Sequence, residues 1–542
     1  MIKNQITNSL LEDIVAAVNK RVGFGREEID RAEKADIEED ISFIKARFYD
    51  AAEKIRSVRE KTDIYLVFCQ KEGIRPDKSG VRAIDEIEAL VKERLKACGA
   101  IFLSADMPID EYSKKKIEYL NEYRAILHLI LSASLVLDRC SPAYNQSLDA
   151  TFFEVNQTRI PTHKNTLYSR NRTSHLLVAL ENQIREVLGF ADKDCCFLVT
   201  SSAMAAYTLI ERYLIQHVLK PGDLILSPPN GIYIEARCEL EGLKPLYRVE
   251  YLSTYDSKEI VRIIEEKKPK VVFLDAIEAA ATMRVIDVEV VIKAIAAKER
   301  NEDIFFVIDG TLISGELNPF KWINGNPQVH IFYYTSLTKY LQLGFDLVMA
   351  GFLAADVSLR EILERTRART GAAPYEFVIN IFPGYTPDIF KKRMQRISRN
   401  ALLVSRHITK DPALSSKVSV YYPGLESHPD FKTAEKHEFI GGLLFLVFKD
   451  HRLNNHEALN EFIDDVFLPL AKRYGVSAAK SDSFGFTIPR FFSSGFAIPR
   501  NNSPFGSSTA ASRVSIGDYT YRETCLLAHI IAEALEQFTG GR

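Results

Sequence analysis

Apolar residues recur at helical spacing through the first 150 residues of this 542-residue chain. Ile37, Ile41 and Ile44 lie on one such face, with acidic and basic residues between them, and a similar stripe runs through 113–137. Spacings of three and four residues place side chains on one face of a helix. The pattern predicts a helical extension at 1–150. Packing or oligomerisation is the usual role of such stripes, and a binding or regulatory role is the alternative.

The pattern changes after residue 150. Residues 151–390 begin with a polar arm and then alternate short apolar runs, such as CCFLVT and PKVVFLDA, with helical stretches. Strands alternating with helices predict an α/β domain whose mostly parallel sheet carries helices on both faces. Residues 391–542 mix longer helices with strands, and a smaller C-terminal α+β domain is expected there. Within it, a Gly/Ser/Pro-rich stretch at 481–512 is interpreted as an active-site loop or a surface excursion.

Two of the apolar runs end at polar side chains. The run IFFVID ends at Asp309, and the run IFYYTSLTKY carries Ser336, Thr338 and Lys339. In open α/β sheets, ligands bind beyond the carboxyl ends of the strands. A carboxylate and a lysine at two such ends could hold a pyridine nitrogen and an aldehyde, which is what pyridoxal phosphate chemistry requires.

A run of small residues that includes Ser202, Ala203 and Met204 lies where a strand gives way to a helix. Small residues there allow a phosphate to approach the amides at a helix N-terminus, where the helix dipole also favours an anion. The chain has neither a GxGxxG fingerprint nor a GxxxxGKS/T loop. Their absence from the sequence argues against a dinucleotide site or a P-loop.

Composition and charge narrow the function classes further. The formal net charge of -2 gives no electrostatic case for nucleic acid or an anionic membrane. Hydrophobic residues make up 46% and charged residues 26% of the chain, as in soluble globular proteins. Seven scattered cysteines without a CxxC pair favour a reducing compartment over a disulfide framework or a zinc site. The N-terminus is unlike a signal peptide, and the apolar run near Ile126 is short enough for a buried helix, so a cytoplasmic protein is expected.

Several short motifs occur together in one order along the chain. They are YSR at 168–170, SSAM at 201–204, LKPGD at 219–223, VIDGT at 307–311, SLTKY at 336–340, YYPGLESHP at 421–429 and SRVSIG at 512–517. In these motifs the chain resembles the Cys/Met-metabolism family of pyridoxal-phosphate-dependent enzymes. That family includes cystathionine γ-synthase, cystathionine and methionine γ-lyases and O-acetylhomoserine sulfhydrylase. The resemblance implies a fold-type I transferase or lyase that binds pyridoxal 5'-phosphate.

The resemblance implies a role for each residue of the cofactor site. Lys339 would form the internal Schiff base and, once released, move protons between Cα and Cβ as a general base. Asp309 would pair with the pyridinium nitrogen. Ser336 and Thr338 would bind the phosphate together with the SSAM segment.

The resemblance also implies contributions from more distant parts of the chain. Tyr168 and Arg170 would reach the phosphate of a neighbouring subunit's cofactor, so a homodimer or homotetramer with shared active sites is expected. Arg513 would bind the substrate α-carboxylate, and Ser483 would line the same pocket. Tyr233 is the candidate for the tyrosine that stacks over the cofactor ring, and a core tyrosine is the alternative interpretation.

The departures from the family pattern lie mainly on the substrate side. Ala203 stands in place of a glycine, DAIEAA at 275–280 stands in place of ETPSNP, and Gln342-Leu343 stands in place of two glycines. The expected reaction is γ-replacement with a nucleophilic co-substrate, or γ-elimination, through a vinylglycine quinonoid. Its substrate would be an O-acylhomoserine, a sulfur amino acid or S-adenosylmethionine. The alternatives are β-elimination or β-replacement on cysteine-like substrates, and a non-catalytic protein on the same scaffold.

Overall fold

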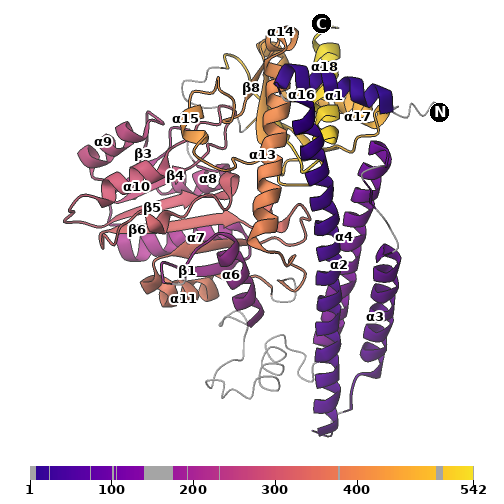
Figure 1. Cartoon of the computed structure of the whole chain (residues 1–542). Helices are drawn as coiled ribbons and strands as arrows, with labels where there is room; N and C mark the ends of the chain where they lie inside the picture. The colour runs from indigo at the N-terminus through magenta and orange to yellow at the C-terminus, as the bar shows by residue number, and fades with distance from the viewer. Residues whose placement is uncertain are drawn as a thin grey trace.

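A large sheet with its helices, a second smaller sheet and a column of long helices make up the fold (Figure 1). The large sheet lies on one side of the molecule and the long helices stand on the other, with the last helices of the chain at the top. This computed structural model describes residues 8–540 except 24, 72, 74, 100–102, 105–106, 140–174, 192, 231, 376–378 and 496–504.

The N-terminal extension consists of long helices, α1 (Asn8–Val22), α2 (Arg26–Lys71), α3 (Lys78–Gly99) and α4 (Ile109–Arg139). Glu27 and Glu28 lie in the first turn of α2, where negative charge stabilises a helix. α4 packs against α2 and α3, and α1 packs against the C-terminal helix. Among the described residues, only the helix 109–137 is long and apolar enough to cross a membrane, and 44% of its most apolar window is buried in the fold. A core helix has the same properties.

Seven strands form the large sheet. They are β1 (Cys196–Thr200), β2 (Leu224–Ser227), β3 (Arg248–Tyr251), β4 (Val271–Asp275), β5 (Ile304–Asp309), β6 (Val329–Ser336) and β7 (Gly351–Ala355). Their order is β1-β7-β6-β5-β4-β2-β3. The strands from β2 to β6 pair in parallel, and β7 is antiparallel to both of its neighbours. The prediction of a mostly parallel sheet is therefore confirmed.

Helices cover both faces of this sheet, as the sequence predicts. Along β1, Phe197 and Val199 belong to one buried cluster, and Cys196 and Leu198 belong to another. Successive side chains of a strand point to opposite faces, so the two clusters lie on the two sides of the sheet. The helices of this region are α6 (His175–Val187), α7 (Ala203–Tyr213), α8 (Ile234–Gly242), α9 (Ser257–Lys267), α10 (Val288–Ala296) and α11 (Arg360–Thr370).

The C-terminal part contains the second sheet, with strand order β10-β11-β12-β9-β8. Its elements are α13 (Pro387–Thr409), α14 (Pro412–Ser415), β8 (Val418–Tyr421), α15 (Phe431–Ala434), β9 (Leu443–Phe448), α16 (His456–Glu461), α17 (Leu468–Arg473), β10 (Ala479–Lys480), β11 (Arg490–Ser494), β12 (Ala511–Ser515) and α18 (Tyr521–Gly540). The stretch 481–512, expected to be an active-site loop or a surface excursion, also contributes a strand, β11, which pairs with β12. Its phenylalanines favour a strand, and pairing with β12 stabilises that strand although Gly, Ser and Pro residues flank it.

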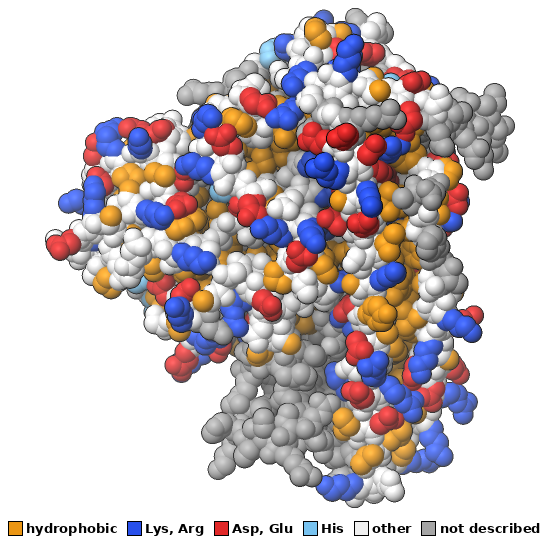
Figure 2. Space-filling view, viewed as in Figure 1, with side chains coloured by type: hydrophobic (Ala, Val, Ile, Leu, Met, Phe, Trp, Pro, Cys, Tyr) orange, Lys and Arg blue, Asp and Glu red, His pale blue; other side chains and the backbone are white. Residues whose placement is uncertain are grey.

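Hydrophobic side chains are also exposed on the long helices (Figure 2). Tyr49 is 75% exposed and Val67 is 64% exposed on α2, and Leu135 is 41% exposed on α4. The opposite faces of these helices are buried. Ile44 and Ile55 belong to the main hydrophobic core, which continues into the two other parts of the fold.

Candidate active site

A cavity of about 970 Å³ lies at the carboxyl ends of β4, β5 and β6. The first turn of α7 and segments of the C-terminal part complete its wall. Asp309, Lys339 and Arg513 all line it, although they come from β5, from the segment after β6 and from β12. The structure therefore places three residues that the sequence analysis singled out around one space.

The start of α7 forms one end of the cavity. Ser202 caps this helix, and its hydroxyl accepts a hydrogen bond from the Ala205 amide at 3.0 Å. The first turn contains no acidic residue, so its free amides and the helix dipole favour an anion. Ala203 has a right-handed helical backbone, which accommodates the methyl group that replaces the family's glycine.

A glycine on β7 allows this helix start to approach the sheet. A Cβ atom on Gly351 would lie 2.4 Å from the Ala203 nitrogen and 2.5 Å from the Ser202 carbonyl carbon. Ser336 and Thr338 line the cavity at the end of β6, and their hydroxyl oxygens are 2.6 Å apart. The hydroxyls and the α7 amides together could bind a phosphate group.

Lys339 follows the end of β6 and is largely buried. Its ammonium group donates a hydrogen bond to the Ser483 hydroxyl at 2.7 Å and lies 5.3 Å from the centre of the Phe484 ring. Burial, followed by the positive charge of Arg513, lowers the pKa of Lys339 from its ordinary value. A lysine with a lowered pKa is present more often as the neutral amine, which is the form that reacts with an aldehyde or accepts a proton.

Two carboxyl groups lie side by side beneath the cavity. Asp309 and Asp275 are direct neighbours at the ends of β5 and β4, and both line the cavity. Burial raises the pKa of both groups, and the negative charges of Asp309 and Glu278 raise that of Asp275 further. The Asp309 carboxylate accepts a hydrogen bond from the Thr311 amide at 2.8 Å, but Oδ1 of Asp275 is buried without a partner. Neither aspartate forms a salt bridge within the described part of the chain.

Arg513 lies on β12 at the other side of the cavity. Its guanidinium carbon is 5.2 Å from the centre of the Phe492 ring, and its Nη2 is buried without a hydrogen-bond partner among the described residues. Burial lowers the pKa of Arg513, although the charge of Asp482 opposes this effect. An unpaired guanidinium N–H at the wall of a cavity fits a ligand carboxylate.

Tyr233 precedes α8 and lines the cavity, but it is 43% exposed. Burial of its hydroxyl and a hydrogen bond with Glu235 raise the pKa of Tyr233. Its stacking over a cofactor ring stays a prediction. Tyr168 and Arg170 lie outside the described residues, so their contribution to a neighbouring site also stays a prediction.

The sequence analysis missed an acidic group on the cavity wall. Glu278 is 3% exposed, and its carboxylate accepts hydrogen bonds from Asn230, Tyr255 and Thr282. It belongs to the 275–280 segment that replaces the family's ETPSNP. Asn230 and Tyr255 come from other segments of the chain, so no local sequence signal indicates that Glu278 is a buried carboxylate with these partners.

These residues fit pyridoxal phosphate. The helix start and the two hydroxyls suit its phosphate, and Lys339 suits its aldehyde. Two buried carboxyl groups that form no salt bridge with any residue in the described part of the chain suit a pyridine nitrogen that carries a proton. The sheet and this site define a fold-type I pyridoxal-phosphate enzyme.

The sequence profile of the Cys/Met metabolism PLP-dependent enzyme family matches residues 137–476. This match covers more than half of the chain, and the protein therefore belongs to that family. The first three described helices and nearly all of α4 precede the matched region.

Curated relatives and solved structures are consistent with this assignment. The chain is 28% identical over 403 residues to a protein described as the bifunctional enzyme flvA of Aspergillus flavus, covering 73% of this chain and 45% of that protein. It is 25% identical over 248 residues to an L-methionine gamma-lyase of Fusobacterium nucleatum subsp. polymorphum, covering 44% of this chain and 56% of that enzyme. The chain thus spans about half the length of the curated relatives it matches.

Solved structures show the same fold at lower identity. The metB structure from Corynebacterium glutamicum superposes with a TM-score of 0.55 and 22% identity, covering 70% of this chain and 90% of that one. A cystathionine gamma synthase from Xanthomonas oryzae pv. oryzae, solved with aminoacrylate and cysteine, gives a TM-score of 0.54 and 20% identity. It covers 71% of this chain and 91% of that one.

Proposed function

We propose that this protein uses pyridoxal phosphate to catalyse γ-replacement or γ-elimination on an amino acid with a γ leaving group. The observation that carries this proposal is the convergence of Lys339, the Asp275–Asp309 pair, the start of α7 and Arg513 around one cavity. The Nη2 of Arg513 has no hydrogen-bond partner among the described residues. O-acylhomoserines, sulfur amino acids and S-adenosylmethionine are the candidate substrates. Replacement by a nucleophilic co-substrate is favoured because the substrate side departs most from the family pattern.

Lys339 is the proposed proton carrier. The bound cofactor would supply an electron sink for the bond broken at Cα. With its lowered pKa, the amine of Lys339 can accept the Cα proton, pass it on and then accept a proton from Cβ. Loss of a proton at each of these two carbons is what allows the γ leaving group to depart with its bonding electrons. The Ser483 hydroxyl, 2.7 Å from this amine, would keep it oriented between the two carbon atoms.

Arg513 is proposed to bind the substrate, and the carboxyl pair is proposed to bind the cofactor ring. The free Nη2 of Arg513 would donate to the substrate carboxylate. Asp309 would accept the hydrogen bond of the protonated pyridine nitrogen, and that positive charge would offset the cost of burying two carboxylates. Tyr168 and Arg170 are proposed to complete the phosphate site of a second subunit, so a homodimer is the smallest active form.

Substrate trials with the full chain and added pyridoxal phosphate test the reaction. O-acetylhomoserine, cystathionine, methionine and S-adenosylmethionine would each be supplied, with release of the leaving group as the readout. If none of them releases its leaving group, the γ-chemistry is wrong. Cystathionine separates the alternatives, because cleavage on the γ side yields cysteine and cleavage on the β side yields homocysteine. Lys339→Ala serves as the control and should lose both the turnover and the visible absorbance of cofactor joined to lysine.

A further inference from the structure

The segment after Lys339 has an unusual backbone. Leu343 has a φ of 54°, Gly344 of 86° and Asp346 of 48°, all in the left-handed region. Bulky and branched residues rarely adopt this conformation, and surrounding structure must hold them in it. Asp346 lines the cavity, and its negative charge acts on the amine of Lys339. The contacts that hold residues 343–346 in this conformation therefore also fix the position of Asp346 relative to the Lys339 amine.

The N-terminal extension holds the segment through Phe345, which is 2% exposed. The Phe345 ring stacks against Phe43 of α2, with centroids 6.1 Å apart, and contacts Tyr123 of α4, with centroids 4.9 Å apart. The Tyr123 hydroxyl in turn donates to Asp50 of α2 at 2.6 Å, which fixes its ring. Two helices of the extension thus enclose one side chain of the lysine segment.

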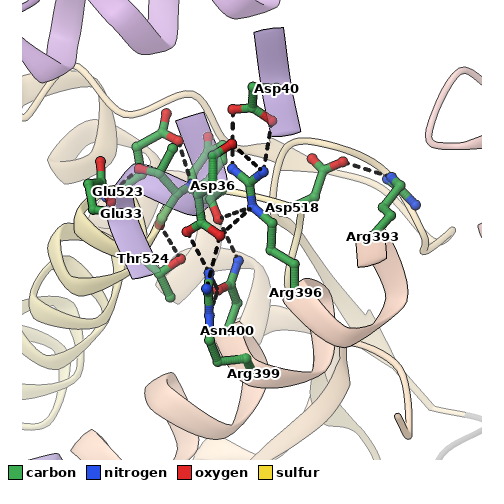
Figure 3. A network of polar contacts seen from close by, with 12 residues as sticks. Glu33, Asp36, Asp40, Arg393, Arg396, Arg399, Asn400, Asp518, Glu523 and Thr524 are labelled. Atoms are coloured by element: carbon green, nitrogen blue, oxygen red, sulfur yellow. Dashed lines mark hydrogen bonds and ion pairs between the residues drawn. The ribbon is translucent and has the colours of Figure 1, made fainter. Parts of the chain in front are cut away.

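A second, polar route runs from the extension to the same place. Lys116 of α4 is buried, and its ammonium group lies 2.9 Å from Asp40 and donates to the Asp518 carbonyl at 3.0 Å. The Asp518 carboxylate accepts from Nε of Arg393 at 2.7 Å, and Nη2 of Arg393 donates to the Gly485 carbonyl at 3.0 Å. Figure 3 shows Asp40, Asp518 and Arg393 within the network that joins α2 to α13.

Both routes end at the lysine. A Cβ atom on Gly485 would lie 2.9 Å from the Lys339 carbonyl carbon, and a Cβ atom on Gly344 would lie 2.8 Å from Nη2 of Arg393. Gly485 also follows Ser483 by two residues, and Ser483 accepts the hydrogen bond of the lysine amine. The guanidinium of Arg393 therefore lies between the segment after Lys339 and the loop that orients its amine.

We infer that the N-terminal helical extension is a structural part of the active site, and that Phe43, Tyr123 and Lys116 are positioning residues for Lys339. They act on the lysine by two routes. One is the packing around Phe345, and the other is the series of hydrogen bonds from Asp518 through Arg393 to Gly485. This role rests on the proposed function of Lys339. It gives the extension, which precedes the region matched by the family profile, a task in catalysis rather than in packing alone.

Phe43→Ala tests the apolar route, and Ile64→Ala is its matched control. Ile64 lies on the same helix and is also half-buried against the hydrophobic core, but it lies about 30 Å further along the helix axis. In Phe43→Ala, looser packing admits water to Lys339 and raises the pKa of its amine towards the ordinary value. We expect pyridoxal phosphate to bind about tenfold more weakly. The pH at which half of the bound pyridoxal phosphate is covalently attached to Lys339 should rise by about one unit. Ile64→Ala should match the parent in both measurements.

Lys116→Met tests the polar route, with Lys115→Met as its control. Lys115 is the preceding residue of the same helix, but it forms a surface pair with Glu111. We expect Lys116→Met to shift the pH of cofactor attachment in the same direction as Phe43→Ala, and Lys115→Met to leave it unchanged. Circular dichroism melting curves establish that all four variants are folded at the assay temperature. If Phe43→Ala is unfolded there, Phe43→Leu, which keeps apolar volume without the ring, replaces it.

The outcomes separate the two proposals. A parent protein that never shows the visible absorbance of lysine-bound cofactor contradicts the proposed function itself. A parent that shows it, with folded Phe43 and Lys116 variants that match their controls in cofactor affinity and pH dependence, overturns the positioning role alone. Shifts confined to the Phe43 and Lys116 variants support it.

Discussion

Replacing Asp275 by asparagine should stabilise the cofactor-free protein at neutral pH. Asp275 is 6% exposed, has a buried Oδ1 without a partner and neighbours Asp309 directly across the strand pair. Ionising both groups therefore places two negative charges in one low-dielectric site. Asparagine keeps the shape and removes one charge. A buried polar group without a partner costs about 1–3 kcal/mol, and a charged one costs more, so we expect a gain of at least about 1 kcal/mol in the free energy of unfolding.

The gain should depend on pH. Burial and the neighbouring charges raise the pKa of folded Asp275 above its unfolded value of about 4. The parent is therefore most stable below the unfolded pKa, and that contribution is lost as pH rises through the raised folded pKa. The asparagine side chain in Asp275→Asn does not titrate. The difference between Asp275→Asn and the parent should accordingly be small in acid, grow over that window and level off above it.

Urea unfolding of both proteins between about pH 5 and about pH 9 measures this difference. Glu181→Gln is the contrasting control, because Glu181 is equally buried but accepts a hydrogen bond from Arg367 at 2.8 Å. Breaking that pair should destabilise the protein by about 3 kcal/mol. With pyridoxal phosphate bound, the gain from Asp275→Asn should shrink, because the protonated pyridine nitrogen supplies the missing positive charge. If Asp275→Asn is no more stable than the parent at any pH without cofactor, the reasoning about this pair is wrong.

Three further substitutions probe other parts of the site and its support. Arg513→Lys should raise KM for the amino-acid substrate at least about tenfold without changing the cofactor absorbance, because an ammonium group cannot bind a carboxylate through two N–H groups; steady-state kinetics measure it. Gly485→Ala places a Cβ atom at a φ of 87° against the Lys339 backbone, so a thermal melt should show a loss of about 1–2 kcal/mol, together with weaker cofactor binding. Arg396→Met removes a buried cation that pairs with both Asp36 and Asp40. Denaturant unfolding should show that the free energy of unfolding falls by about 3 kcal/mol.

The strand ends that carry the site are predictable from local sequence. β5 and β6 are short apolar runs rich in Phe, Tyr, Ile and Val, and each ends at a polar residue, so Asp309 and Lys339 could be assigned to one edge of a sheet. Asp275 also ends such a run, but its pairing with Asp309 depends on β4 lying next to β5. Strand order is set by tertiary packing, and periodicity within one strand does not reveal it.

Gln342 and Leu343, which replace two glycines of the family pattern, lie in the segment that the N-terminal extension contacts through Phe345. The Gln342 side-chain oxygen accepts hydrogen bonds from the Leu347 amide at 2.7 Å and the Val348 amide at 2.9 Å, so one side chain closes the turn that Leu343 begins. A left-handed leucine costs about 1–2 kcal/mol, whereas the family's glycine would adopt this backbone without strain.

The extension supplies compensating contacts, because Phe345 is buried between α2 and α4. Nothing in the sequence itself connects the glycines replaced at Gln342-Leu343 with the helical stripe of the first 150 residues. In the structure they are two parts of one arrangement, because the strained turn that carries Asp346 is held by α2 and α4 of the N-terminal extension.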